Sequence, residues 1–218
     1  MSISTRLTAV CLLFTLAPVV QAAVVYGTSA AAELSGSRSV TANTITVNNS
    51  DPDWNDAVLS WNIVDQLNGT FTYTYTFTGF DSPAISHFTL DLSDDAVSDP
   101  AAVTGAKYNG AGFGTIEFGD KDGITGAVKF DIGGDDGTLT YEFTSNRSPV
   151  YGDFLVKAGN DQTATNIGFG DQSLMTTTSY IARPNGVAVP EPSAFLYLGL
   201  FALATFGTRR LTKRRLAR

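Results

Sequence analysis

Cysteine is almost absent from this chain: Cys11 is the single one among 218 residues, and it lies in an apolar N-terminal run. With no second cysteine, an intrachain disulfide is excluded, and the rest of the chain offers no thiol nucleophile. Cys11 also does not fit a lipid-anchor cysteine, because Val10 precedes it where a small residue is needed.

Histidine is equally scarce, since His87 is the only one. A zinc site usually needs several His or Cys ligands. Ser86 is adjacent to His87, but successive residues of a strand point to opposite faces, so a Ser–His nucleophile pair is not expected. We expect His87 to make a structural hydrogen bond.

Glutamate is limited to four positions, Glu33, Glu117, Glu142 and Glu191. Glycoside hydrolysis needs two carboxyl groups about 5–10 Å apart in a cleft, and the sequence offers no way to pair them. Glu142 alternates with large aromatic residues and is expected to face solvent. The chain is therefore not predicted to be an enzyme, and a secreted hydrolase is only a third alternative.

Basic residues are few outside the C-terminus, and the whole chain has 14 Lys and Arg against 21 Asp and Glu. Six of the 14 lie from Arg209 onward and one is Arg6, so the stretch between these two residues carries a charge of about −14. Nucleic-acid binding is excluded, because phosphates need Lys and Arg to neutralise them. Solvation is the simpler role for the acidic residues, with cation binding as the alternative.

Residues 1–22 are typical of a secretory signal peptide. Arg6 supplies the positive start, residues 7–19 form the apolar segment, and Val20-Gln21-Ala22 is a small-x-small cleavage site. We expect export through the Sec translocon and cleavage by signal peptidase between Ala22 and Ala23. A retained N-terminal anchor is the alternative.

The C-terminal tail over 190–218, together with Val189, has three parts in order. Val189-Pro190-Glu191-Pro192-Ser193 precedes an uncharged apolar run over about 194–208, and a basic end over 209–218 follows with Arg209, Arg210, Lys213, Arg214 and Arg215. A helix over the apolar run rises about 22 Å, which is short against a hydrocarbon core of about 30 Å. The positive-inside rule places the basic end in the cytoplasm. A core helix with a solvated end is the alternative.

This tail resembles the PEP-CTERM sorting signal of Gram-negative bacteria. The resemblance covers about thirty of the 218 residues, with Pro190, Glu191 and Pro192 matching the motif. It implies transient insertion into the inner membrane and cleavage near the motif by exosortase, a transpeptidase-like protease. The catalytic residues of that step belong to exosortase, and the motif is only its substrate.

Residues 23–182 are predicted to form one all-β domain, an antiparallel β-sandwich or jelly roll, and residues 183–189 a linker. In Thr70–Thr78 aromatic residues alternate with threonines, which is typical of a strand with one buried face. Asn68-Gly69 before it is a hairpin-turn signal. Further strands are expected at Thr44–Val47, Ala57–Val64, Ser86–Leu92, Gly114–Phe118, Gly126–Ile132, Thr138–Phe143, Gly152–Lys157 and Thr177–Ile181.

The sequence offers candidate residues for two kinds of ligand site. Asp51, Asp53 and Asn55 place oxygen atoms at alternate positions, as calcium loops do, but the segment lacks the glycine and the final glutamate of an EF-hand. No cofactor is therefore predicted, with calcium as the alternative. Trp54 and Trp61 would stack on sugar rings if they were exposed, although core packing is the simpler role.

The sequence thus predicts an exported protein of the cell surface or extracellular matrix, with a structural or adhesive role in exopolysaccharide or biofilm. The runner-up is a carbohydrate- or calcium-binding module. The expected partners are exosortase, the Sec translocon and signal peptidase, the inner membrane transiently, and exopolysaccharide as an alternative.

Overall fold

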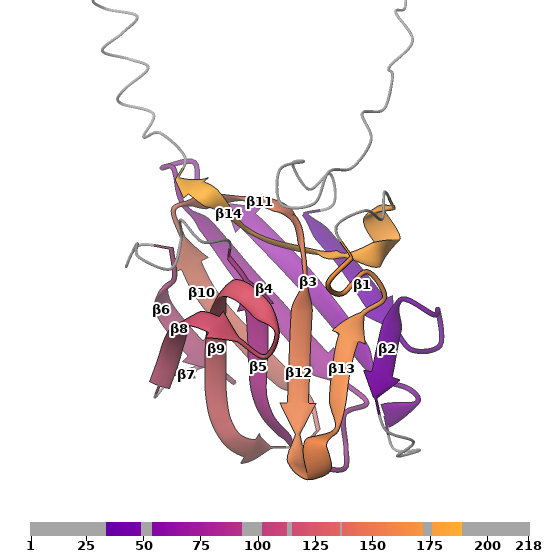
Figure 1. Cartoon of the computed structure of the whole chain (residues 1–218). Helices are drawn as coiled ribbons and strands as arrows, with labels where there is room; N and C mark the ends of the chain where they lie inside the picture. The colour runs from indigo at the N-terminus through magenta and orange to yellow at the C-terminus, as the bar shows by residue number, and fades with distance from the viewer. Residues whose placement is uncertain are drawn as a thin grey trace, which may run out of the picture.

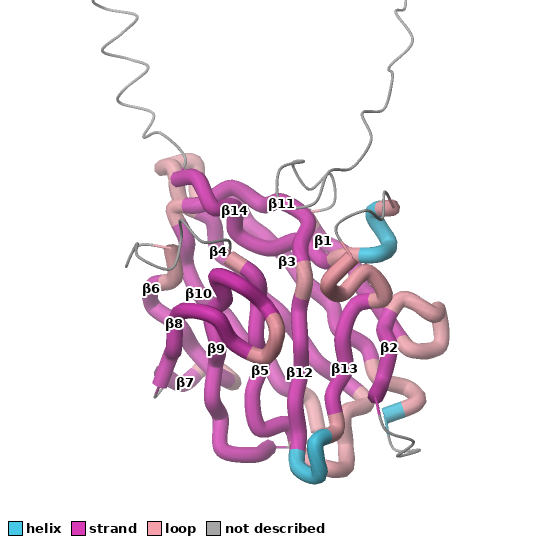
Figure 2. The backbone as a smooth tube through the Cα atoms, in the orientation of Figure 1, coloured by secondary structure: helices cyan, strands magenta, loops and turns pink. Residues whose placement is uncertain are grey.

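A computed structural model of the chain describes residues 34–48, 54–92, 102–112, 115–135, 137–171 and 176–188 (Figure 1). These segments form strands joined by turns and short 3₁₀ helices (Figure 2). The strands are β1 (Ser35–Ser39), β2 (Ile45–Asn48), β3 (Val58–Asp65), β4 (Phe71–Thr78), β5 (Ile85–Asp91), β6 (Thr104–Tyr108), β7 (Ala111–Gly112), β8 (Thr115–Lys121), β9 (Ile124–Asp135), β10 (Leu139–Ser145), β11 (Arg147–Gly152), β12 (Phe154–Ala158), β13 (Thr163–Asn166) and β14 (Ile181–Ala188). The 3₁₀ helices include η2 (Gly159–Asp161) and η3 (Thr177–Ser179).

The strands are arranged in two six-stranded antiparallel sheets and a two-stranded ribbon. Sheet I has the order β1-β3-β4-β10-β6-β7, sheet II has the order β2-β13-β12-β5-β9-β8, and β11 with β14 forms the C-terminal ribbon. The expected all-β, antiparallel, sandwich-like fold is confirmed. The signal segment over 1–22 and the apolar run over 194–208 lie outside the described residues.

Aromatic side chains of β4 join the two sheets. Tyr73, Tyr75 and Phe77 are fully buried, whereas the threonines between them stay partly exposed, as the alternation predicts. Phe88 of β5 meets the rings of Phe77 and Tyr75 with centroids 4.9 and 5.4 Å apart. Edge-on and tilted ring contacts of this kind add to the free energy gained from burying the rings. The core therefore lies between the inner faces of sheets I and II.

Hydroxyl groups of two β4 tyrosines connect the C-terminal ribbon to this core by hydrogen bonds. The hydroxyl of Tyr75 donates to the Ala182 carbonyl at 2.8 Å, and that of Tyr73 donates to the Arg147 carbonyl at 2.7 Å. Burial raises the pKa of both tyrosines, so each remains a protonated donor. Each bond satisfies a phenol that would otherwise be buried without a partner.

A buried ion pair connects the ribbon to sheet II. Arg183 Nη2 lies 2.9 Å from Asp91 Oδ2, with the two side chains only 1% and 3% exposed. Arg183 Nη1 also donates to the Pro184 carbonyl at 2.7 Å. The guanidinium passes closely over Gly152, where an added Cβ would lie 2.2 Å from Arg183 Nε.

The linker expected over 183–189 is wrong for residues 183–188, because they belong to β14. Pro184 and the Asn185-Gly186 pair are turn signals in a single sequence. Pro184 lies opposite Pro149 of β11 in a ribbon of only two strands, where missing amide donors are tolerated. Arg183 holds the segment to the core through Asp91. The body of the protein therefore extends beyond its expected boundary at 182.

Other differences also arise where the alternation is weak. The strand expected over Thr177–Ile181 is instead η3 followed by the start of β14. β1, β6, β7, β11 and β13 were not predicted. Of these, β1, β6 and β13 have the sequences SGSRS, TGAKY and TATN. These segments lack large apolar residues at every second position, so their pairing with neighbouring strands decides their structure.

We expect Gly152→Ala to lower the free energy of unfolding by about 1–3 kcal/mol, because the new methyl group must displace a fully buried, ion-paired guanidinium. Gly112→Ala is the matched control, since a Cβ there meets nothing within 4 Å. Urea denaturation of both variants measures the effect. Equal stability of the two variants would contradict the close packing of Arg183 against Gly152.

Candidate functional site

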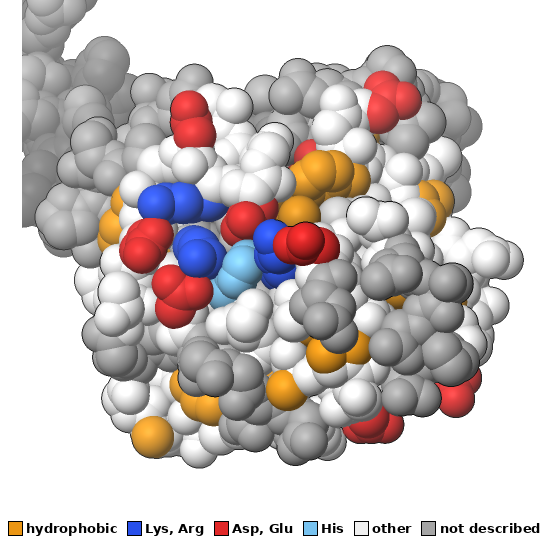
Figure 3. Space-filling model, turned by 60° about the horizontal axis from the view of Figure 1, so that its bottom comes forward, with side chains coloured by type: hydrophobic (Ala, Val, Ile, Leu, Met, Phe, Trp, Pro, Cys, Tyr) orange, Lys and Arg blue, Asp and Glu red, His pale blue; other side chains and the backbone are white. Residues whose placement is uncertain are grey.

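The outer face of sheet II carries a polar cluster centred on His87. His87 of β5 lies opposite Lys157 of β12 and Asp131 of β9. Thr89, two residues along β5, lies opposite Lys129 of β9. Residues paired across antiparallel strands share a face, so side chains from three strands meet here. In Figure 3 the single histidine of the chain lies among basic and acidic side chains.

The β8–β9 hairpin brings Asp122 onto this face. Asp122 and Gly123 have positive φ angles of 52° and 83° and form a two-residue turn between Lys121 and Ile124. A register shift between Gly119 and Lys121 bends the hairpin. Behind the turn, a small apolar cluster fixes the hairpin against the sheet; its members are Ile124, Ala127, Leu155 and Phe169.

Asp122 contacts two side chains of β5. Its Oδ2 atom accepts a hydrogen bond from Thr89 Oγ1 at 2.5 Å and lies 3.1 Å from His87 Nε2. The His87 approach is short but not aligned as an N–H···O bond, so it is an electrostatic contact. His87 itself is only 8% exposed.

Ser86 contradicts the expectation that it would be separated from His87. Its Oγ atom lies 3.2 Å from His87 Nδ1, at a point where the pairing of β5 with β9 shifts register between Ile85 and His87. The same hydroxyl also donates to the Lys157 carbonyl at 3.0 Å. A nucleophilic serine must present its proton to the histidine. A proton held by a backbone carbonyl favours a structural role, as expected for His87.

Ion pairs neutralise the remaining charges of this face. Lys129 Nζ lies 3.0 Å from Asp131 Oδ1, and Lys157 Nζ lies 3.1 Å from Asp161 Oδ1. Burial is the largest effect on His87 and lowers its pKa. Asp122 and Asp131 oppose this lowering, whereas Lys129 and Lys157 reinforce it. The face thus holds a neutral imidazole within balanced charges.

Of the three candidate calcium ligands, only Asn55 lies in the described part of the chain. Asp51 and Asp53 lie outside the described residues, and Asn55 is exposed in the turn before β3. Within the described segments, no group of three or more His, Cys, Asp or Glu side chains is arranged to hold a metal ion.

The residues predicted for signal cleavage and sorting also lie outside the described part of the chain. These residues are Ala22, Ala23, Val189, Pro190, Glu191, Pro192, Ser193, Arg209, Arg210, Lys213, Arg214 and Arg215. Among the residues that the structure describes, no helix is both long and apolar enough to span a membrane.

Both tryptophans belong to the core. Trp54 is 0% and Trp61 is 3% exposed. Trp54 meets Phe80 edge-on at 4.9 Å, and the Arg38 guanidinium lies 4.7 Å from the Trp61 ring centroid. Neither ring is available to stack on a sugar, which confirms core packing as their role.

The outer face of sheet I differs from that of sheet II because it is rich in hydroxyl groups. Thr74 of β4 lies opposite Asn62 and Glu142, and Thr76 lies opposite Ser60 and Thr140. We call this surface the hydroxyl face; its members on β3, β4 and β10 are Ser60, Asn62, Thr72, Thr74, Thr76, Thr78, Thr140, Glu142 and Thr144. In these three strands the charged residues are Asp65 and Glu142. The face is therefore polar but nearly neutral.

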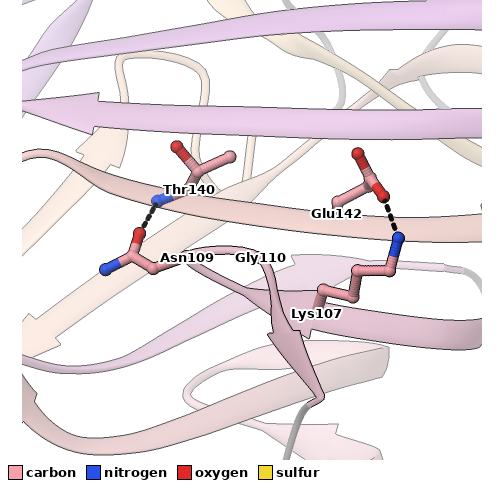
Figure 4. Close-up of a pocket in the computed structure, with 5 residues that line it drawn as sticks. All are labelled: Lys107, Asn109, Gly110, Thr140 and Glu142. Carbon is pink, nitrogen blue, oxygen red and sulfur yellow. Dashed lines mark hydrogen bonds and ion pairs between the residues drawn. The ribbon is translucent and has the colours of Figure 1, made fainter.

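A groove of about 500 Å³ borders the hydroxyl face at the β6–β7 turn (Figure 4). Lys107 Nζ lies 2.9 Å from Glu142 Oε1, which confirms that Glu142 faces outward. Asn109 Oδ1 accepts a hydrogen bond from the Thr140 amide at 2.8 Å. Gly110 completes the lining and leaves space where a side chain would stand. The groove thus offers charged and amide groups beside a surface of hydroxyls.

No protein-family model, curated protein or solved structure matches this chain.

We expect the stability of the protein to fall on acidification in a manner that depends on His87. Because the folded state favours the neutral imidazole, His87 contributes stability that is complete above its ordinary pKa of 6.5. That contribution is lost as the pH falls through the lowered pKa of the folded state. Urea unfolding at about pH 7.5 and about pH 5 should show a larger loss for the natural chain than for His87→Gln.

Asp122→Asn provides the matched test. It removes the carboxylate that opposes the lowering of the His87 pKa, so the loss of stability on acidification should be larger than in the natural chain. If the natural chain and His87→Gln lost equal stability, the assigned direction of the shift would be wrong.

Proposed function

We propose that this chain is an exported protein of the cell surface or extracellular matrix, sorted by exosortase through its C-terminal tail. The observation that carries the proposal is the order of the tail: the Pro190-Glu191-Pro192 motif, the apolar run over about 194–208 and the basic end. The run would form a transmembrane helix that holds the protein briefly in the inner membrane. Exosortase would then cut near the motif, and the protein would take a structural or adhesive role in exopolysaccharide.

The fold supports this proposal in two ways. β14 ends at Ala188, directly before Val189 and the motif, so the sorting segment follows the folded body without an added domain. The body is a disulfide-free, acidic, antiparallel sandwich-like fold, which suits a soluble display domain. The His87 cluster holds a serine whose hydroxyl proton is directed to the Lys157 carbonyl, so it has no part in this proposal.

We expect the double variant Glu191→Ala/Pro192→Ala to retain its tail in a host with active exosortase, because the motif is the part that the protease recognises. Intact-mass measurement of the surface and membrane fractions distinguishes the forms. The natural chain should lose both residues 1–22 and everything after the motif.

Glu142→Ala, an acidic residue on the folded body, is the control and should be processed normally. Removal of the tail from the double variant at the natural rate would refute sorting through this motif. Additional mass on the new C-terminus of the natural chain would identify covalent attachment to another molecule.

A second candidate function, carbohydrate binding, is favoured by the hydroxyl face and its groove. Sugars are neutral and rich in hydroxyl groups, so they match a surface with many Ser, Thr and Asn side chains and few charges. Lys107, Asn109 and Glu142 add directional donors and acceptors at the rim. Ligand sites of this kind use a few placed polar groups to fix orientation. Such a site would bind exopolysaccharide through its polar side chains, because both tryptophans are buried.

Lys107→Ala/Glu142→Ala should weaken binding of purified matrix polysaccharide about tenfold, because two rim groups lose their hydrogen bonds. The pair Lys121→Ala/Glu117→Ala is a matched control, since it removes a comparable ion pair of 2.7 Å from sheet II. Isothermal titration calorimetry measures both. Equal affinities for the two double variants would remove the groove as the binding site.

A further inference from the structure

One end of the sandwich gathers exposed apolar side chains and also contains the last residue of β14. Phe71, at the start of β4, lies opposite Asp65 of β3 and Ser145 of β10. Arg147, two residues after Ser145, lies opposite Ala188 of β14. We call this the exit end; it comprises the end of β3 with the turn that follows it (63–70), residues 145–147, residues 34–35 at the start of β1, and the end of β14 (Figure 1).

Three of the five exposed large apolar residues of the described segments lie at the exit end. Leu67 is 86% exposed, and Leu34 and Val64 are each 45% exposed. The Leu34 carbonyl accepts from the Ile63 amide at 2.7 Å, which places Leu34 beside the last residues of β3. These three residues come from two strand ends and one turn.

Leu67 has no explanation in the stability of the fold. Its φ angle of 57° lies in the left-handed region, which a leucine adopts unfavourably. Its amide donates to Asp65 Oδ1 at 2.8 Å and the Gln66 amide donates to the Thr70 carbonyl at 2.9 Å, so the turn is ordered without the Leu67 side chain. The side chain itself points to solvent and gains no burial.

The length of chain after Ala188 limits which end can approach a membrane. Residues 189–193 separate Ala188 from the apolar run, and they span at most about 20 Å when fully extended. The eight-residue strands β3 and β4 are about 27 Å long, so the opposite end of the sandwich lies farther away than this reach. The exit end therefore lies within reach of the bilayer while the tail is retained, whereas the opposite end does not.

We propose that the exit end rests on the lipid surface before processing, with Leu67 inserted at the level of the headgroups. This inference rests on the proposed function, because it needs the tail to hold the chain at the membrane. A single leucine binds lipid weakly, but a short tether keeps it at a local concentration in the millimolar range. Release of the tail removes the tether, and the same contact then becomes too weak to retain the protein.

The test uses the full chain with Cys11→Ser, which leaves no native cysteine, and one introduced cysteine carrying an environment-sensitive fluorophore. Leu67→Cys reports the exit end, and Asp81→Cys, exposed in the β4–β5 loop, is the control at the opposite end. The protein is made in a host without exosortase and reconstituted into phosphatidylcholine vesicles containing a lipid-borne quencher. The label at 67 should be quenched at least about twofold more than the label at 81, as expected for insertion at the headgroups.

The outcomes separate the two proposals. If the protein floats with the vesicles but the labels at 67 and 81 are quenched equally, the lipid contact is refuted and the proposed sorting stands. If the protein does not float with vesicles, the tail does not hold it at a membrane and both proposals fail. Should Leu67→Cys not fold, a label at the neighbouring exposed Gln66 gives the same decision.

Discussion

Phe88 is the side chain on which the pairing of the two sheets depends. From β5 of sheet II it touches Phe77, Tyr75 and Tyr141 of sheet I, with centroid separations between 4.9 and 5.4 Å. Because every second residue of β4 and β10 is committed to this layer of rings, the residues between them must face outward. The polar character of the outer face of sheet I is therefore a consequence of the aromatic core.

The buried pair of Asp91 and Arg183 has a different role. Taking two charges out of water costs free energy that their attraction only partly offsets, so such a pair is weak evidence for overall stability. It is effective at fixing position, because either charge left alone in the interior would be strongly unfavourable. The pair ties β14 to the end of β5, and with Tyr75 it fixes the strand that ends at Ala188. The point at which the chain leaves the body is thus set by the core.

The fixed position of Ala188 determines where both the Leu67 turn and the groove would lie relative to the membrane. The β3–β4 turn with Leu67 lies at the exit end, whereas the Asn109-Gly110 turn of the groove lies beyond Tyr108, which pairs with Tyr141 away from that end. A chain held by its tail would rest Leu67 on the bilayer and direct the groove toward the surroundings of the cell. The hydroxyl face would then be accessible to polysaccharide. The charged groups around His87 would have the structural role of holding the β8–β9 hairpin in place.

The sequence by itself determined the all-β class, the core face of β4 and the outward position of Glu142, because strict alternation of large apolar and polar residues allows one orientation of a strand. The sequence also shows the three parts of the tail, since they are contiguous. Only the tertiary structure decided that residues 183–188 form a strand, because the partners of Arg183 and Pro184 are distant in sequence. It also decided that Asp122 reaches His87 and that Ser60, Thr76 and Thr140 form one row. Those contacts depend on strand register and on a bent hairpin, and register is fixed by packing between segments that no local pattern relates.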